Sequence, residues 1–251
     1  MEKMPAWADV VLVPLISLLL AAAISALVIM GIGEDPVAAV KMMVSGALGS
    51  TYGWGYTLYY ATNFMFTGLA VSVAFHAKMF NIGGEGQAMI GGLGVALMAL
   101  FIPWPHWSLA LIFCSIGGAV FGALWALIPA ILQAKRGSHI VITTIMFNFM
   151  AAALLNYLLV SILRPVKSMD PATASFPEPT HLPTLHDILM PLGIEFSKSA
   201  PANVSLLLAL AAAVFVWVLI WRTRLGYALR AFGHSDTAAQ YAGINPVKIT
   251  I

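Results

Sequence analysis

The amino-acid sequence predicts an all-α protein, a polytopic bundle of transmembrane helices. Of its 251 residues, 61% are hydrophobic and only 9% are charged. The mean hydropathy of +0.91 is far above that of soluble domains. The formal net charge is +2, and the basic residues are scattered along the chain. This composition excludes a soluble enzyme domain and argues against a surface for nucleic acid.

The apolar residues gather in six stretches that reach, or nearly reach, the length needed to cross a bilayer. About 20 apolar residues are needed, because backbone groups find no water inside the hydrocarbon. The first stretch also resembles a signal peptide, since Lys3 precedes it and residues 21–26 are small. Its apolar run is too long for one, so an uncleaved helix is predicted. The predicted spans are residues 10–32, 56–75, 88–102, 108–132, 140–163 and 204–221.

The placement of lysine and arginine predicts that the N-terminus lies in the cytoplasm. With that orientation the cytoplasmic segments hold eight basic residues and the outer segments four. The cytoplasmic set is Lys3, Lys78, Lys135, Arg136, Arg222, Arg224, Arg230 and Lys248, and the outer set is Lys41, Arg164, Lys167 and Lys198.

Residues 1–251 are expected to form a single transmembrane domain with two distinctive connections. Residues 164–203 are proline-rich and predict an extracytoplasmic loop with a short helix near residues 185–190. Residues 222–250 are basic and predict a cytoplasmic loop, after which the chain stops where a seventh apolar run begins. The bundle is therefore expected to be truncated. Small residues recur every four positions, as closely packed membrane helices require: Gly118 and Gly122, and Ala88, Gly92 and Ala96.

The stretch "NIGGEGQ", residues 81–87, is the strongest candidate for a functional site. The apolar run that follows it covers only residues 88–102, so the polar run is expected to dip into the membrane and a helix to begin at Gly86 or Ala88. Its glycines weaken helix formation, and broken helices form binding sites in transporters. A role for Glu85 in lining or gating a solute pathway competes with simple helix capping. The pathway or gate candidates are Asn81, Gly83, Gly84, Glu85, Gln87 and Asn148.

Other polar residues in the spans have simpler interpretations. Thr143 and Thr144 are expected to bond backbone carbonyls one turn back. Asn148 and Asn156 lie eight residues apart, near one helix face, where they either line a pore or join helices. Cys114 is expected to be a packing residue, and no metal site is predicted.

The basic loop carries two short amphipathic patterns. Leu225, Ala228, Leu229 and Phe232 have the spacing of one helical face. Gly233 is expected to break this helix, with Ser235 or Thr237 capping a second one and Gly243 just past its end. The pair either rests on lipid headgroups or docks a cytoplasmic partner, and the small residues Ala238, Ala239 and Ala242 favour the partner.

Three stretches resemble permeases of ATP-binding-cassette (ABC) importers, in the branched-chain amino acid, simple-sugar and nucleoside branch. They are "FNIGGEGQAMIGG", "RGSHIVITTIMFNFMAAALLNYLL" and "RTRLGYALRAFGHSDTAAQYAGI". The resemblance is nearest to the nucleoside or simple-sugar type. It implies a multi-pass protein of the bacterial inner membrane, a second permease subunit as homodimer or heterodimer, a cytoplasmic ABC ATPase and an extracytoplasmic solute-binding protein. It also implies that the loop seats in the ATPase through Arg224, Leu225, Gly226, Leu229, Arg230, Ala231, Gly233, Ala238, Ala239, Gly243 and Ile244.

Rival functions make different demands on the sequence. No lysine follows a glycine, so a phosphate-binding P-loop is absent and ATP must be used by a partner. The protein itself is therefore expected to be neither an enzyme nor the holder of a cofactor, and the spans lack the motifs of intramembrane enzymes. The alternative is an ion-coupled secondary transporter with Glu85 as its coupling site.

Overall fold

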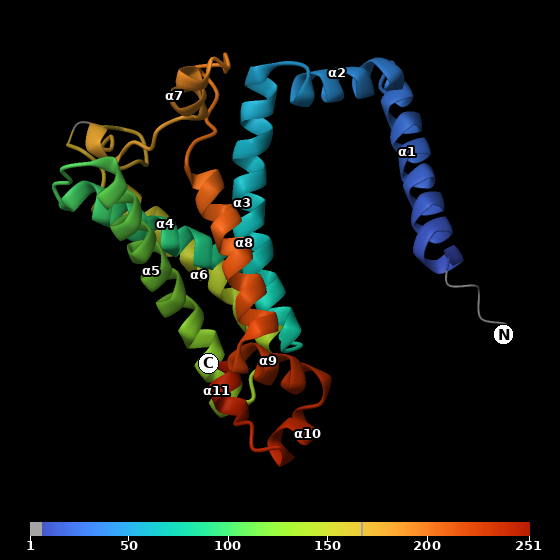
Figure 1. Ribbon diagram of the computed structural model, residues 1–251, viewed down its shortest axis with the longest axis vertical. Helices are drawn as coiled ribbons and strands as arrows, with labels where there is room; N and C mark the ends of the chain where they lie inside the picture. The colour runs from blue at the N-terminus through green and yellow to red at the C-terminus, as the bar shows by residue number, and fades with distance from the viewer. Residues whose placement is uncertain (1–6, 167) are drawn as a thin grey trace. The chain divides into compact units, whose positions relative to one another are not determined.

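The computed structural model describes residues 7–166 and 168–251, and its regular elements there are helices (Figure 1). One isolated antiparallel bridge joins Thr184 to Asn203. Lys3 and Lys167, which entered the orientation argument, lie outside the described residues. The predicted all-α class is confirmed.

Six of the described helices are long and apolar enough to cross a membrane, as the sequence predicted. Their bounds differ from the expected ones by a few residues at most ends. They are Val10–Gly31, which contains α1 (Val13–Gly31), α3 (Thr51–His76), α4 (Gly84–Phe101), α5 (Trp107–Arg136), α6 (Ile140–Ser161) and α8 (Ser205–Arg222).

The chain divides into two compact units, Met1–Thr57 and Leu58–Ile251. The first contains a π-helical turn (Ala8–Leu12), α1 and a short apolar helix that the span count missed, α2 (Pro36–Leu48). The sequence did signal α2, because the Asp35 carboxylate caps it by accepting from Val37 N–H at 2.9 Å and Pro36 occupies its first turn.

The second unit is organised around the crossing of α4 and α5, where glycines let the two backbones meet. A β-carbon added to Gly94 would lie 2.6 Å from the Gly117 carbonyl oxygen and 2.7 Å from the Phe121 ring. One added to Gly118 would lie 2.9 Å from Val95, so both partners in this crossing depend on glycine. The predicted Gly118 and Gly122 pair therefore belongs to this contact. A β-carbon added to Gly92, in contrast, would have no atom within 4 Å.

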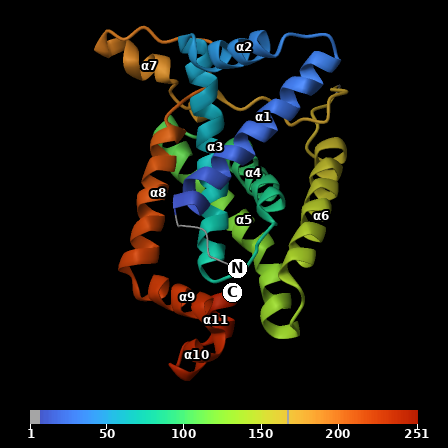
Figure 2. The ribbon, with the colours of Figure 1, turned by 90° about the vertical axis from the view of Figure 1, so that its right-hand side faces the viewer.

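The last three helices of the second unit lie at one end of α8 (Figures 1 and 2). They are α9 (Arg224–His234), α10 (Asp236–Tyr241) and α11 (Pro246–Thr250). The corner between α8 and α9 is pinned by Thr223, whose hydroxyl donates to the Leu219 carbonyl at 2.5 Å and accepts from Gly226 N–H at 3.0 Å. A side chain on Gly226 would collide with the Leu219 and Ile220 carbonyls.

The long connection between α6 and α8 lies at the opposite end of the second unit from α9 to α11 (Figure 2). It contains the predicted short helix as α7 (Leu185–Leu189), between the 3₁₀ turns Glu178–Thr180 and Met190–Leu192. The Thr184 backbone N–H and hydroxyl both donate to the Asp187 carboxylate, at 2.9 and 2.8 Å, and lower the pKa of that carboxyl. The contribution of this cap to stability is therefore present at neutral pH and is lost as the pH falls through the lowered pKa.

Candidate functional site

The polar segment singled out in the sequence lies deep among the helices of the second unit. Helix α3 ends at His76, the chain runs without helical structure through residues 77–83, and α4 begins at Gly84. The expected start of α4 at Gly86 or Ala88 was therefore wrong by two to four residues. Gly84, Gly86 and Gly91 all lie within this helix.

The depth of this segment follows from the neighbours of α4. The Gln87 carbonyl lies opposite Gly122, which stands 14 residues before the end of α5. At 1.5 Å per residue that separation is about 21 Å. Asn148, which contacts the start of α4, stands eight residues after the start of α6, or about 12 Å along its axis. The start of α4 is thus recessed from the adjoining ends of both helices.

Asn148 fastens the recessed segment to α6. Its side-chain Oδ1 accepts from Gly86 N–H at 2.9 Å, and its Nδ2 donates to the Ile82 carbonyl at 2.9 Å. It therefore satisfies a free N–H of the first turn of α4 and a carbonyl of the non-helical backbone. Gly86 permits this approach, since a β-carbon there would lie 2.9 Å from Asn148 Oδ1. Asn148 thus joins α6 to the start of α4.

We expect Asn148→Ala to destabilise the purified chain by about 1–2 kcal/mol, because two hydrogen bonds are lost and one of the backbone groups left without its partner, at Gly86, lies in a buried residue. Asn156→Ala on the same helix is the matched control, because Asn156 is exposed. Unfolding with sodium dodecyl sulfate from a mild detergent would measure both variants. Equal stability of the two variants would contradict this role of Asn148.

Asn81 and Gln87 face each other across the start of α4. Asn81 Oδ1 accepts from Gly83 N–H at 2.9 Å, while the two contacts between the amide groups are long, at 3.4 and 3.5 Å. Gly83 is confined between them and α6, because a β-carbon there would lie 2.9 Å from Asn81 Oδ1 and 3.1 Å from Thr144 Cβ. Thr144 itself donates to the Ile140 carbonyl at 2.8 Å, as predicted.

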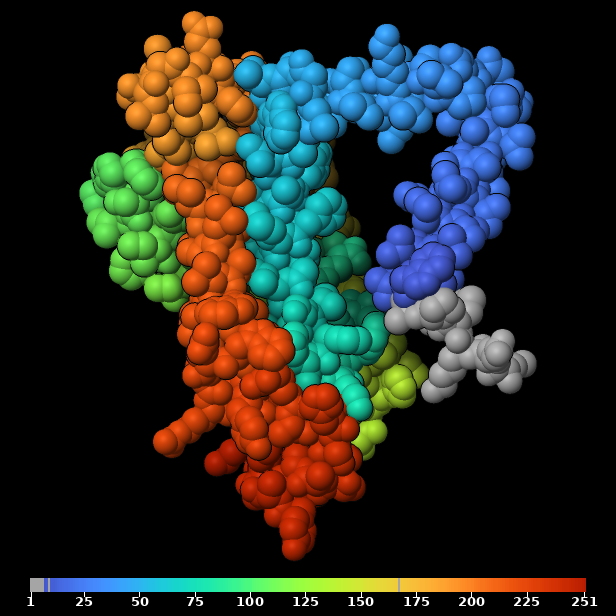
Figure 3. Space-filling view, turned by 45° about the vertical axis from the view of Figure 1, so that its right-hand side comes forward, coloured from blue at the N-terminus to red at the C-terminus, as the bar shows by residue number. Residues whose placement is uncertain are grey.

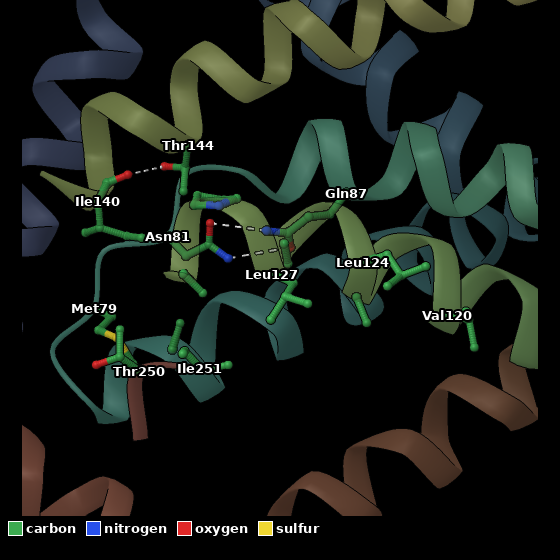
Figure 4. A pocket seen from close by; sticks show the side chains of 15 residues that line it. Met79, Asn81, Gln87, Val120, Leu124, Leu127, Ile140, Thr144, Thr250 and Ile251 are labelled. Atoms are coloured by element: carbon green, nitrogen blue, oxygen red, sulfur yellow. Dashed lines mark hydrogen bonds between the residues drawn. The ribbon is translucent and has the colours of Figure 1, made fainter. Parts of the chain in front are cut away.

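These two amides line a cavity of about 480 Å³ (Figure 4). The cavity continues toward α11, where Thr250 lines it, and α5 supplies an apolar wall that includes Leu124 and Leu127. This volume is in the range of small-molecule sites. Thr250 could not be identified as a lining residue from the sequence, because α11 reaches the cavity only through the fold.

Glu85 lies apart from this cavity. Its side chain is exposed, does not line the cavity and has no hydrogen-bond or ion-pair partner among the described residues. Two residues along a helix correspond to about 200° of rotation, so Glu85 and Gln87 occupy nearly opposite faces of α4. Gly84 is likewise away from the packed contacts, with no atom within 4 Å of a β-carbon built on it. The structure thus brings together Asn81, Gly83, Gln87 and Asn148 but not Glu85 or Gly84.

The predicted apolar face of the basic loop packs against the end of α3. Leu229 is buried in a cluster with Ala77 and Ile249, and Ala228 and Phe232 pack against it. Leu225 remains half exposed, and Arg224 is exposed. The Arg230 guanidinium lies 4.5 Å from the centre of the Trp221 ring. The Trp221 and His76 rings are perpendicular to each other, with 6.1 Å between their centres.

Gly233 does not break the helix, which corrects the sequence interpretation. Helix α9 continues to His234, and Ser235 caps α10 by accepting from Ala238 N–H at 3.3 Å. Gly233 is buried, and a side chain on it would collide with the His76 carbonyl at the end of α3. Glycine is therefore needed for this close approach and not for a turn.

Helix α10 and the turn after it form the outer part of this end (Figure 3). Gly243 has φ +84°, and Ile244 N–H donates to the Ala239 carbonyl at 2.9 Å, which is the predicted glycine-terminated helix end. Ala239 is buried, whereas Ala238, Ala242 and Tyr241 are exposed, Tyr241 to 98%. Ala231 and Ile244 are half-buried. Ala238, Ala242 and Tyr241 thus form an exposed surface on α10 and the turn after it.

Six apolar helices, a recessed polar segment and an uncharged cavity beside it define a polytopic membrane protein with polar groups gathered inside its bundle. The chain belongs to the family of permease components of branched-chain amino acid transport systems, whose model matches residues 53–251. That match includes the recessed segment and all of α9 to α11.

Three curated relatives show the same similarity over nearly the whole chain. A glucose ABC transporter permease of Haloferax volcanii is 34% identical over 92% of this chain and 60% of its own length. A guanosine ABC transporter permease of Bacillus subtilis is 34% identical over 93% of this chain and 64% of its own length. A nucleoside ABC transporter permease of Lactococcus lactis is 30% identical over 96% of this chain and 65% of its own length. The chain thus spans less than two thirds of each relative, and no solved structure matches it significantly.

Proposed function

We propose that this chain is a membrane-spanning subunit of an ABC importer that brings a nucleoside or a simple sugar into the cytoplasm. The family match carries this proposal, since residues 53–251 fit a model of transport permeases. The named solutes of the relatives, guanosine, nucleosides and glucose, support the solute class. Transport is driven by a partner ATPase, by alternating access in the bacterial inner membrane. A second permease subunit and an extracytoplasmic solute-binding protein complete the assembly.

We propose that the ATPase docks on α9 and α10, at the cytoplasmic end of the second unit. The exposed small residues Ala238 and Ala242 and the protruding Tyr241 offer a surface for close protein contact. Arg224 adds an exposed charge, while Gly226, Leu229 and Gly233 hold α9 in position from behind. With the N-terminus in the cytoplasm, this end of the second unit faces the cytoplasm. The long connection between α6 and α8, which contains α7, then faces outside, where it meets the solute-binding protein.

We propose that the solute passes the recessed segment and that Asn81, Gly83, Gln87 and Asn148 form its gate. The cavity beside Asn81 and Gln87 lies between this segment and α11, which packs with α9 in one cluster. A displacement of α9 by the ATPase therefore reaches the gate through the end of α3, which α9 contacts and which leads directly into residues 77–83. Glu85 is not part of this gate, because it lies on the exposed face of α4, away from the cavity.

The decisive experiment is solute uptake into vesicles that contain the full-length protein, its cognate ATPase and its binding protein. We expect uptake to require ATP and to persist when a protonophore collapses the membrane potential. We also expect the Glu85→Gln variant to take up the solute. Uptake that continues without ATP, stops with the protonophore and is abolished by Glu85→Gln would instead establish the ion-coupled carrier. Co-purification of the ATPase with the chain provides the second readout.

A further inference from the structure

The cavity beneath Asn81 and Gln87 has one polar wall and one apolar wall (Figure 4). The polar wall consists of the two amide side chains around the start of α4. The hydroxyl groups of Thr144 and Thr250 also line the cavity, but they donate to the Ile140 and Pro246 carbonyls. The facing wall is aliphatic and comes from α5, where Val120, Leu124 and Leu127 line it. Among the described residues that line the cavity, none carries a charged side chain. The cavity therefore favours a neutral solute whose polar groups lie on one side.

The amide pair has hydrogen-bonding capacity to spare. Asn81 Oδ1 is committed to Gly83 N–H at 2.9 Å, a well-formed bond. Asn81 Nδ2 meets Gln87 Oε1 only at 3.5 Å, which is the outer limit of a hydrogen bond. A donor and an acceptor thus lie side by side at the cavity wall, each weakly engaged. A solute with a neighbouring acceptor and donor would replace this long contact with two shorter bonds.

The two solute classes of the proposed function differ in how they match these walls. A nucleobase such as guanine carries an N–H next to a C=O on one edge, and its flat apolar faces can lie on Leu124 and Leu127. A hexose carries hydroxyl groups around its whole rim, so several would face the aliphatic wall of α5 without a partner. Each polar group buried without a partner weakens binding by about tenfold or more.

We propose that Asn81 and Gln87 are specificity-determining residues that read the hydrogen-bonding edge of a nucleobase, so that the solute is a nucleoside and not a simple sugar. This inference rests on the proposed function and narrows it. Gln87 is the better residue to vary, because its side-chain hydrogen bonds among the described residues join it to Asn81, whereas Asn81 also accepts from Gly83 N–H.

The test is photolabelling of the assembled importer, in membranes without its binding protein, by 8-azidoguanosine. The azide stands on the ring edge away from the N–H and C=O that the amides would contact. We expect guanosine to compete with labelling at least tenfold better than 1-methylguanosine, which lacks the N–H donor, and better than glucose. Gln87→Met should abolish this discrimination, because it keeps the length of the side chain but removes the amide. Gln133→Met on α5, outside this cavity, is the matched control and should retain it.

A second variant tests the apolar wall independently of the amides. Leu124 is 57% exposed, so Leu124→Asn should leave the fold intact while it improves competition by glucose and weakens competition by guanosine. Equal competition by guanosine and 1-methylguanosine in the unmodified protein, or full discrimination in Gln87→Met, would overturn the inference even if ATP-driven nucleoside uptake is observed. Failure of the proposed function has a different signature, namely no ATP-driven uptake of either solute and no associated ATPase.

Discussion

Replacement of Gly94 by valine is expected to destabilise the purified chain by about 3 kcal/mol or more. A β-carbon at this position would lie 2.6 Å from the Gly117 carbonyl and 2.7 Å from Phe121. The carbonyl belongs to a helix backbone, so it cannot move aside without separating α4 from α5. The start of α4, and with it the amide pair, would lose its support.

Gly92→Val is the matched control for this prediction. Gly92 lies two residues earlier in the same helix, and a β-carbon there meets nothing within 4 Å. The loss of glycine is the same in both variants, so the difference between them isolates the crossing of α4 and α5. Denaturant titration of both proteins in one detergent would measure it. Similar unfolding midpoints for Gly94→Val and Gly92→Val would show that the crossing is not as close as described.

Gly233→Val is expected to reduce solute uptake by at least about tenfold, because its side chain would push α9 away from the His76 carbonyl. The cluster of Leu229, Ala77 and Ile249 would open with it. If the ATPase docks on α9 and α10, its motion would then no longer reach the recessed segment. Uptake and ATP hydrolysis measured on the same vesicles would separate loss of coupling from loss of binding.

The control for Gly233→Val is His234→Ala, since the neighbouring His234 side chain is exposed. This variant should keep normal uptake. Gly233→Ala should give an intermediate loss, because the smaller side chain needs a smaller displacement of α9. Normal uptake by Gly233→Val, with the protein at wild-type abundance, would contradict the contact between α9 and α3 as a route of coupling.

The helical spans could be predicted from sequence because bilayer length and backbone hydrogen bonding leave few alternatives. The six predicted stretches match six helices, and the short helix in the proline-rich connection lies where it was expected. Helix α2 was missed although Asp35 and Pro36 mark its start, because its 13 residues are too few to cross a bilayer. Helix α11 was missed in the same way, although Asn245 caps it and Pro246 occupies its first turn.

The candidate site was only partly predictable. Asn81 and Gln87 were singled out as polar residues of a glycine-rich run between apolar stretches and Asn148 as an amide within a span, and the structure gives each a polar partner. To predict that Glu85 points away from these residues, one must know that α4 begins at Gly84. The glycines around that position hide the start of the helix in the sequence. Gly233 was misread for a related reason, because a glycine needed for a close helix contact has the same local pattern as one that ends a helix. Such contacts depend on residues more than 150 positions apart and leave no local signal.

The hydrogen-bonded corner at Thr223, between α8 and α9, determines which part of the second unit can move. Two hydrogen bonds of Thr223 and the close packing of Gly226 against the Leu219 and Ile220 carbonyls hold the angle between α8 and α9. We therefore expect the two helices to move together as one rigid unit. Residues 77–83, between α3 and α4, lie outside the helices and directly follow His76, whose carbonyl α9 approaches at Gly233. If the ATPase docks on α9 and α10, we therefore expect its movement to reach the backbone beside the cavity and not to be taken up by bending at the corner.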